Sequence, residues 1–400
     1  MRIEEIAPPS WRERLGGAWD RLLLESSDPT IFLSFPWIES WWRNFGSRLE
    51  PRLLALWDES GHLRGLAPLY VRRLGAGRGG PRMLCVMGDE GVGSEYLGIL
   101  ARREEVDTVV STLSSHLRGS WSLADLRGLR EDSSSAGALT RALSQEAPGR
   151  VHFERYPCSC IPLPDDYETY LASLPQKFRS TLRYRTNKLV KNFQVRLLRT
   201  REESEIAPHL SRFFEMHQAR WIAGGHPGSF YTEAKRAFYG EVSREFLRCG
   251  WLRFYHLEID GVVRASQFGF AFNGILHSLQ EAFDSDFHPS GVGGVGVVLR
   301  GMALSESISE GIHGYDFLGG VADYKSRWGT RVHFIQRTRI GAPGLTGALA
   351  FAATAGVRLL KDWGRERSPA WVYRGRERFR SWRRGRHARQ VAAGAGEREG

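Results

Sequence analysis

The sequence lacks an apolar run long enough to span a bilayer. A membrane-spanning helix needs roughly 18 or more apolar residues, whereas the longest candidate, residues 345–357, is shorter and rich in alanine and glycine. Residues 1–6 also lack the apolar core of a signal peptide. We therefore expect a cytoplasmic protein.

Cysteine is scarce, with four residues in a chain of 400. Cys158 and Cys160 are separated by one serine, but no second Cys or His pair follows at the spacing of a zinc site. We expect reduced thiols, no metal and no permanently bound cofactor. The sequence also has no Gly-x-Ser-x-Gly elbow, so it does not predict a covalent enzyme intermediate.

The net charge of +11 is concentrated at one end of the chain. Residues 356–400 contain thirteen Lys and Arg against five Asp and Glu, which leaves only +3 for all other residues. We expect a nearly neutral folded body and a basic tail without a fixed fold. Trp371, Phe379 and Trp382 stand among the arginines of this tail, a composition that suits the surface of an anionic membrane.

The first half has the pattern of an α+β unit. Strand-like runs at residues 52–57 and 63–71 flank a short loop that ends in Gly61, which predicts a hairpin. Further strands are expected at residues 82–87 and 121–126, on either side of a helix at 104–117.

The second half repeats this order. Strands at residues 252–258, 262–270 and 275–281 are joined by Asp260-Gly261 and Asn273-Gly274, which are strong hairpin signals. A helix at 292–310 and a strand at 314–318 follow. The repetition indicates an internal duplication of one unit.

We assign residues 1–155 to the first half, 156–342 to the second, and 343–400 to an Ala-rich helix and the tail. Pro157, Pro162 and Pro164 mark a connection between the halves. A single helix is expected at 167–192.

A glycine-rich turn precedes the helix of the second half. Its residues let the backbone approach a ligand, and the free N–H groups of a helix start favour a phosphate. Neither a Walker lysine nor a βαβ context is present, and the pyrophosphate of coenzyme A fits such a turn. Tight packing of helix on sheet is the structural alternative. The candidate cofactor-binding residues here are Ser290, Gly291, Gly293, Gly294 and Gly296.

Polar residues follow the strand at 314–318. Asp316 is a candidate base and Tyr324 a candidate proton donor, while Lys325 is suited to holding a carboxylate or phosphate. A solvated loop with internal ion pairs would produce the same pattern. His217 is a further catalytic candidate, although a histidine at the edge of an aromatic core is an equally good interpretation. Trp221 is four residues away on the same helical face.

Residues 177–199 contain eight Lys and Arg and no acidic residue. Arg179 and Arg183 are candidates for binding the phosphates of CoA, but an acidic substrate, RNA or a plain solvated helix face also fits this composition.

These segments, in this order, resemble the CelD/BcsL-like family of GNAT acyltransferases, which are relatives of the Fem aminoacyl transferases. The resemblance runs from about residue 32 to residue 328. The segments that carry it are Phe35-Pro36-Trp37, Gly65-Leu66-Ala67-Pro68-Leu69, residues 177–183, His217 with Arg220-Trp221, Asp260-Gly261, Ser290-Gly291, Asp316-Phe317-Leu318-Gly319-Gly320 and Tyr324-Lys325.

The resemblance implies an α+β protein of two tandem GNAT folds, with mixed, mostly antiparallel sheets flanked by helices. It implies an acyl-CoA site in the second half and a degenerate donor site in the first. The reaction would transfer an acyl group from acyl-CoA directly to an amine, such as an amino sugar, an amino acid or an intermediate of polysaccharide or specialised-metabolite synthesis. The candidate substrate-binding residues are Arg220, Trp221, Glu281 and Trp37.

Two other functions stay open. In a Fem-like transferase, an aminoacyl-tRNA would replace acyl-CoA as donor, with the basic run at 177–199 and the tail as the RNA contact. A non-catalytic exopolysaccharide-assembly factor would instead lie peripherally on the inner face of the membrane through the basic tail.

Overall fold

The structure is a computed structural model that describes residues 1–354, except 76–78, 90, 149, 224–227, 229, 291 and 321. The side chains of Arg220, Trp221 and Ala223 are also outside the description. The predicted basic tail therefore lies outside the described residues from position 355 onward.

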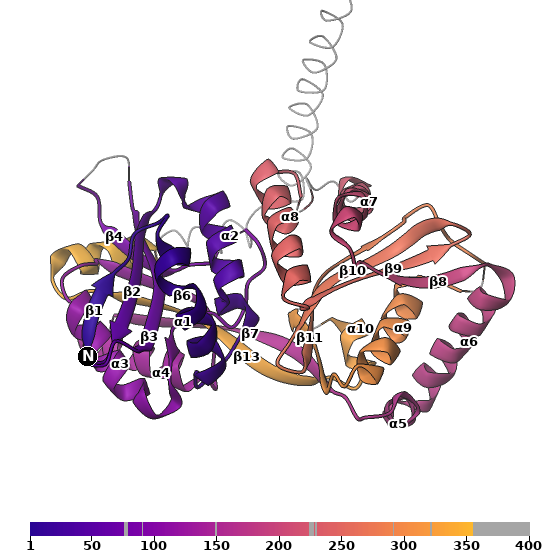
Figure 1. Ribbon diagram of the computed structural model, residues 1–400, viewed down its shortest axis with the longest axis horizontal. Coiled ribbons are helices and arrows are strands. Elements are labelled where there is room, and N and C mark those ends of the chain that lie inside the picture. The colour runs from indigo at the N-terminus through magenta and orange to yellow at the C-terminus, as the bar shows by residue number, and fades with distance from the viewer. Residues whose placement is uncertain are drawn as a thin grey trace, which may run out of the picture. The chain divides into compact units, whose positions relative to one another are not determined.

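Within the described residues, thirteen strands form one continuous sheet (Figure 1). Its order is β1-β2-β3-β4-β6-β13-β7-β12-β11-β10-β9-β8, with β5 paired to β3. The strands are β1 (Arg2–Glu5), β2 (Glu50–Trp57), β3 (Leu63–Arg73), β4 (Arg82–Val86), β5 (Leu100–Ala101), β6 (Leu123–Arg130), β7 (Val151–Pro162), β8 (Val195–Arg199), β9 (Leu252–Ile259), β10 (Val262–Phe272), β11 (Ile275–Phe283), β12 (Gly314–Gly319) and β13 (Arg331–Gly341). The helices are α1 (Trp11–Glu25), α2 (Phe35–Phe45), α3 (Val106–Leu117), α4 (Ser134–Gln145), α5 (Tyr167–Ser173), α6 (Gln176–Asn192), α7 (Glu203–Ala223), α8 (Glu233–Arg248), α9 (Gly296–Ser309) and α10 (Asp323–Ser326), with short 3-10 turns η1 (Ile31–Leu33), η2 (Gly46–Arg48) and η3 (Arg103–Glu105).

The two halves repeat one arrangement. In the first half, β2, β3 and β4 form an antiparallel meander, α3 follows, and β6 returns parallel to β4. In the second half, β9, β10 and β11 form the meander, α9 follows, and β12 returns parallel to β11. The predicted α+β fold, with a mixed sheet flanked by helices, is confirmed.

Turn chemistry explains the hairpins of the second half. Asp260 and Gly261 have φ angles of 50° and 76°, and Asn273 and Gly274 have φ angles of 48° and 73°. Two consecutive positive φ angles match the right-handed twist of the flanking strands, and Asp, Asn and Gly tolerate them best. These local signals place β9, β10 and β11 side by side.

One sequence prediction between the halves is wrong. The connection itself is the long strand β7, which pairs with β12 on one edge and β13 on the other. The expected single helix is interrupted after α5, because Leu174 precedes Pro175 and has extended backbone (ψ 152°). Helix α6 begins at the next residue, Gln176.

Strand β13 joins the halves, since it lies between β6 of the first half and β7. The boundary predicted between residues 155 and 156 falls inside β7. Residues 1–348 form one compact unit.

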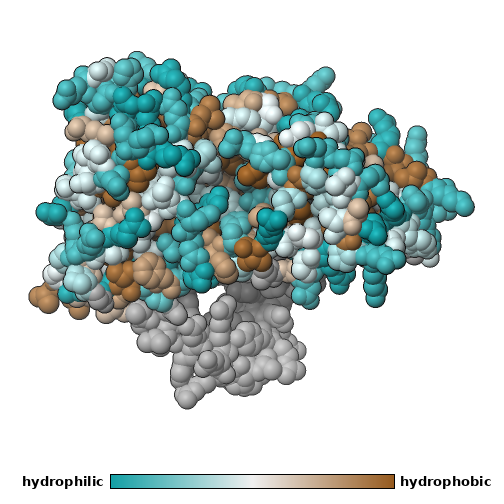
Figure 2. All heavy atoms as spheres, turned by 90° about the horizontal axis from the view of Figure 1, so that it is seen from below, coloured by the Kyte–Doolittle hydropathy of each residue, from teal (hydrophilic) through white to brown (hydrophobic). Residues whose placement is uncertain are grey.

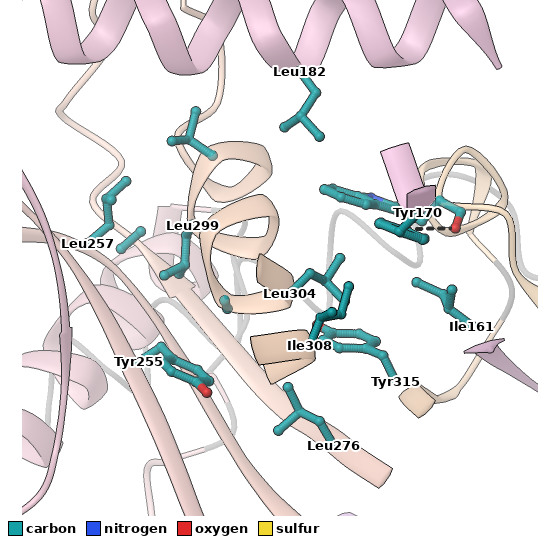
Figure 3. Close-up of a cluster of buried hydrophobic side chains, with 14 of the residues drawn as sticks. Ile161, Tyr170, Leu182, Tyr255, Leu257, Leu276, Leu299, Leu304, Ile308 and Tyr315 are labelled. Atoms are coloured by element: carbon teal, nitrogen blue, oxygen red, sulfur yellow. Dashed lines mark hydrogen bonds between the residues drawn. The ribbon is translucent and has the colours of Figure 1, made fainter. Parts of the chain in front are cut away.

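Helices cover both faces of the sheet of the second half. On β9, Phe254 packs against Phe213 of α7 with ring centroids 5.5 Å apart, whereas the hydroxyl of its neighbour Tyr255 lies 3.4 Å from Ser307 of α9. Consecutive strand residues point to opposite faces, so α7 and α9 lie on opposite sides of the sheet. Figure 3 shows the core on the α9 side, where Leu299, Leu304 and Ile308 of α9 lie among residues of α6 and the strands.

A buried histidine on β9 predicts an acid-sensitive fold. His256 is fully buried, with Nδ1 2.8 Å from Ser266 Oγ and Nε2 3.1 Å from Thr200 Oγ1. Burial, and secondarily His209, lower the pKa of His256 well below its ordinary value. The unfolded chain binds this proton near pH 6.5, so the free energy of unfolding should fall below about pH 6.5, by up to about 1.4 kcal/mol per pH unit.

Urea unfolding between pH 7 and pH 5 measures this effect. We expect the pH dependence to be weaker in His256→Gln than in the wild type and unchanged in His62→Gln, which alters an exposed histidine of the β2–β3 hairpin. Equal pH slopes for His256→Gln and the wild type would contradict the assignment.

Among the described residues, no helix is both long and apolar enough to cross a membrane. On the face shown in Figure 2, hydrophobic residues are interspersed with hydrophilic ones.

Candidate active site

Strands β11 and β12 separate after a short paired stretch. They are parallel and pair only at Ile275–His277 with Gly314–Asp316 among the described residues. Beyond this stretch, β12 pairs with β7 through Gly319 and Cys158, whereas β11 continues to Phe283 beside β10. The facing edges of β11 and β12 therefore diverge, which opens the sheet.

A cavity of about 570 Å³, here called the first cavity, lies at this divergence. Its wall combines α9 on one face of the sheet with His217 of α7 from the other face, so it extends between the two strands. The lining residues are His217, Ser278, Leu279, Gln280, Glu281, Phe283, Asp284, Ser285, Phe287, His288, Gly294, Val295, Gly296, Val297, Arg300, Phe317, Gly319, Tyr324 and Lys325.

The glycine-rich turn forms one end of the first cavity. A side chain at Gly296, the first residue of α9, would overlap the ring of Phe283, so this glycine permits close packing of helix on sheet. Gly293 has a φ of +67°, and a Cβ there would lie 3.0 Å from Nη2 of Arg185 on α6. A Cβ at Gly294 would meet nothing within 4 Å. Free N–H groups at a helix start beside a guanidinium make a favourable site for a phosphate.

A buried ion pair forms another part of the wall. Nη2 of Arg300 donates to both carboxylate oxygens of Glu281, and Arg300 is 3% exposed. The guanidinium also lies 5.2 Å, 5.1 Å and 5.3 Å from the rings of Phe317, Tyr324 and Trp328. Burial alone would lower the pKa of Arg300, but the charge of Glu281 outweighs it and raises the pKa. The pair therefore stays ionised and holds β11, α9 and α10 together.

Lys325 stabilises the backbone at the end of β12. Its Nζ donates to the carbonyls of Gly319 and Gly320, at 2.7 Å and 2.8 Å, and to two more distant carbonyls, those of Phe317 and Leu318. Leu318 has a φ of 57°, a backbone angle that is unfavourable for residues other than glycine. The ammonium thus stabilises a strained turn at the cavity edge. Burial lowers the pKa of Lys325.

Asp316 faces the other side of the sheet. Phe317 lines the first cavity, and its neighbour Asp316 points the opposite way and lines a second cavity. Its Oδ2 accepts from the hydroxyl of Tyr96 at 2.7 Å and its Oδ1 from the N–H of Leu318 at 2.7 Å. Burial would raise the pKa of Asp316, but its contacts with His277, Tyr96 and Leu318 outweigh burial and lower it.

Comparison with known protein families shows which kind of domain the second half contains. Residues 176–326 match the family model described as an acetyltransferase (GNAT) domain. The second half contains a GNAT domain. The chain is accordingly an enzyme of the acyltransferase class.

Solved structures with the same fold cover most of the chain. One is FemX, at 10% identity and a TM-score of 0.57, covering 84% of this chain and 97% of that one. A conserved protein of unknown function from Bacteroides thetaiotaomicron has 13% identity and a TM-score of 0.51, with 85% and 99% covered. The C-terminal domain of a lysylphosphatidylglycerol synthetase from Agrobacterium fabrum has 11% identity and a TM-score of 0.50, with 87% and 96% covered. These likenesses show the fold alone. The curated proteins gave no match.

Three of the four predicted catalytic residues lie around the first cavity. Tyr324, Lys325 and His217 line it, together with the predicted substrate-binding residue Glu281, and His217 is 4% exposed with its ring 4.8 Å from that of Phe230. Asp316 does not join them, since it lines the second cavity instead. Gly291 and the side chains of Arg220 and Trp221 lie outside the description.

Other predicted residues lie elsewhere. Ser290 is exposed and does not line the first cavity. Arg179 donates to the carbonyl of Ala172 at 2.9 Å and Arg183 pairs with Glu168, so both stabilise the α5–α6 connection. Trp37 is fully buried in the core, where its Nε1 donates to Ser94 Oγ at 2.8 Å, and it exposes no surface to a substrate.

Sequence reasoning missed several residues that shape the GNAT domain's site. Arg300 lies on a predicted helix, and a single arginine within the apolar run Val297–Leu304 was a visible signal for it. Glu95 of the first half accepts from the N–H of Gly319 at 2.6 Å, and burial raises its pKa to about 7. No sequence signal placed Glu95 or Tyr96 beside β12, because both come from the other half.

Proposed function

We propose that this protein is an N-acyltransferase that uses acyl-CoA as donor and a small amine as acceptor, with direct attack in a ternary complex. The observation that carries the proposal is the first cavity, which opens where β11 and β12 diverge and ends at the glycine-rich start of α9. We extend the proposal to the CelD/BcsL-like branch and its polysaccharide or specialised-metabolite setting on the order of the sequence motifs.

The proposed donor position follows from the chemistry of the cavity. The pyrophosphate would bind the N–H groups at the start of α9, with the guanidinium of Arg185 beside Gly293. The amides of the pantetheine arm suit the diverging edge of β11, where backbone groups are not paired with β12. Phe283, Phe287 and Phe317 supply an apolar wall for the acyl chain.

Residues of the first cavity then act on the reacting atoms. Orientation of amine and thioester in one site supplies most of the rate enhancement that such a site offers. Tyr324 lies at the cavity wall 5.1 Å from the Arg300 guanidinium and is our candidate for protonating the departing thiolate. Lys325 acts as a positioning residue, because its ammonium is bound to backbone carbonyls.

The first half would bind no donor. Its equivalent helix, α3, is preceded by Arg103–Glu105, so Glu104, Glu105 and Asp107 stand at its start. Carboxylates there repel a phosphate from the same helix dipole that attracts it in α9. We therefore expect one molecule of acyl-CoA per chain.

The basic face of α6 favours a second candidate, transfer from aminoacyl-tRNA. Lys177 and Arg183 are exposed there and Arg179 and Lys188 are half-buried, near the turn that Arg185 contacts. Binding of tRNA that weakens steeply between low and physiological salt would support this donor, and no binding at low salt would exclude it.

A thioester panel tests the proposed function. We expect acetyl-CoA or a longer acyl-CoA to raise the melting temperature and, with a panel of amines, to release free CoA thiol together with an N-acylated product detected by mass spectrometry. If no CoA species stabilises the protein, the proposed donor is wrong.

A further inference from the structure

A second, smaller cavity lies behind the first one. Its volume is about 230 Å³, room for roughly eight water molecules at about 30 Å³ each, which suits a small polar molecule. Both halves of the chain line it, including Asp28, Tyr96, Arg130 and Asp132 from the first half and His277 and Asp316 from the second.

The two cavities are adjacent across the sheet. Asp316 lines the second cavity and the next residue, Phe317, lines the first; the same holds for His277 and Ser278 on β11. His277 and Asp316 also form the last paired rung of β11 and β12 before the strands diverge. A molecule in the second cavity therefore lies beside the point where β11 and β12 begin to diverge. The first cavity extends through the opening between these strands.

Of the described residues that line the second cavity, His277 is the one with a buried side-chain nitrogen that has no hydrogen-bond partner. The residue is 5% exposed, and its Nδ1 has no hydrogen-bond partner among the described residues, although Asp316 Oδ2 lies 3.6 Å away. A buried imidazole that lines a polar cavity in this way costs free energy unless a ligand or water binds it.

The groups that face His277 form one chain of contacts. The hydroxyl of Tyr96 donates to Asp316 and lies 2.8 Å from Nε2 of His333 on β13, while the Arg130 guanidinium of β6 is 5.5 Å from the Tyr96 ring. The aromatic rings of Phe32 and Phe270 close the other sides of the imidazole at 5.9 Å each. The two rings and the Asp316 carboxylate, with its Oδ2 3.6 Å from Nδ1, thus limit how the imidazole can turn.

Charge in the second cavity suits a cation. Three carboxylates, Asp28, Asp132 and Asp316, face one guanidinium, Arg130. Asp132 is paired with Arg130 at 2.7 Å and Asp28 accepts from Ser27 and Ser133–Ser135. Within the described part of the chain, Asp316 accepts from a hydroxyl and a backbone N–H and lies near a histidine, but it forms no ion pair with a lysine or arginine.

We propose that the second cavity binds the acceptor as a small primary ammonium and that His277, positioned by Asp316, takes its proton. This inference rests on the proposed acyl transfer. The ammonium gives one proton to His277, and the freed lone pair forms the C–N bond with the thioester carbonyl carbon. The C–S bond then breaks, the departing thiolate takes the hydroxyl proton of Tyr324, and the second N–H proton returns to Tyr324, which yields the amide and CoA thiol.

Calorimetric titration without any donor tests the cavity itself. The probes are D-glucosamine and ethanolamine, each compared with its neutral counterpart, D-glucose and ethylene glycol. We expect both amines to bind wild-type protein at least about tenfold more tightly than the neutral molecules. If neither amine binds more tightly than its counterpart, the proposal is overturned, and because no thioester is present this result is independent of the donor claim.

A variant tests the role of His277. We expect His277→Gln to bind acetyl-CoA like the wild type but to lose at least about 100-fold in kcat and to change the pH dependence of kcat/KM. The matched control is His62→Gln, which alters an exposed histidine on the β2–β3 hairpin. A His277→Gln protein that keeps more than a tenth of kcat, or that keeps the wild-type pH profile, overturns the assignment. If this variant fails to fold, the wild-type titration still decides the cavity. Failure of acetyl-CoA to bind the wild type would instead refute the proposed function.

Discussion

Replacing Glu281 by Gln is expected to lower the free energy of unfolding by about 3 kcal/mol, the lower end of the range for breaking a buried ion pair. Arg300 is 3% exposed and Glu281 is its carboxylate partner. The amide keeps one acceptor but removes the charge, so the guanidinium is left buried and uncompensated. Because this pair joins β11 to α9 beside the glycine-rich turn, we also expect weaker binding of acyl-CoA.

Urea denaturation measures the loss, and the α5–α6 connection offers a matched control. Glu168 pairs with Arg183 on the surface, where its side chain is 68% exposed, so Glu168→Gln should change stability by less than about 1 kcal/mol. Similar effects of the two substitutions would show that Arg300 is solvated rather than held by Glu281.

Replacing Gly294 by Asp is expected to weaken binding of acetyl-CoA by about tenfold or more. The position is open, since a Cβ there meets nothing within 4 Å, and it lines the first cavity at the start of α9. A carboxylate at a helix start is favourable for folding but repels the pyrophosphate of CoA. The substitution should therefore separate loss of binding from loss of stability.

Gly294→Asn controls for the size of the side chain. We expect this neutral variant to bind acetyl-CoA within about threefold of the wild type and to melt no higher than Gly294→Asp, because it lacks the charge that the helix start favours. If Asn and Asp weaken binding equally, the side chain blocks the site sterically and the turn does not bind a phosphate by charge.

Parts of the fold that a few neighbouring residues determine could be predicted from the sequence, whereas parts that depend on distant contacts could not. The Asp260-Gly261 and Asn273-Gly274 turns fix their hairpins within a few residues, and these strands were predicted close to their observed positions. Strand β7 was missed because its stability comes from pairing with β12 and β13, more than 150 residues away, which outweighs the three prolines near its end.

The candidate site likewise has parts that local motifs predict and parts that they do not. The glycine-rich turn and the Tyr324-Lys325 segment are local motifs, and the structure places both around the first cavity. Asp316 was grouped with them, although strand alternation puts it on the face opposite Phe317. Its partners Tyr96 and His333 come from distant segments, so only tertiary structure brings them together.

A crystal structure of the protein with acetyl-CoA tests the central claim most directly. The account predicts the pyrophosphate at residues 293–296, within reach of Arg185, and the thioester between β11 and β12 near Phe317. Acetyl-CoA bound away from the start of α9, or a first cavity that stays empty at saturating acetyl-CoA, would contradict it.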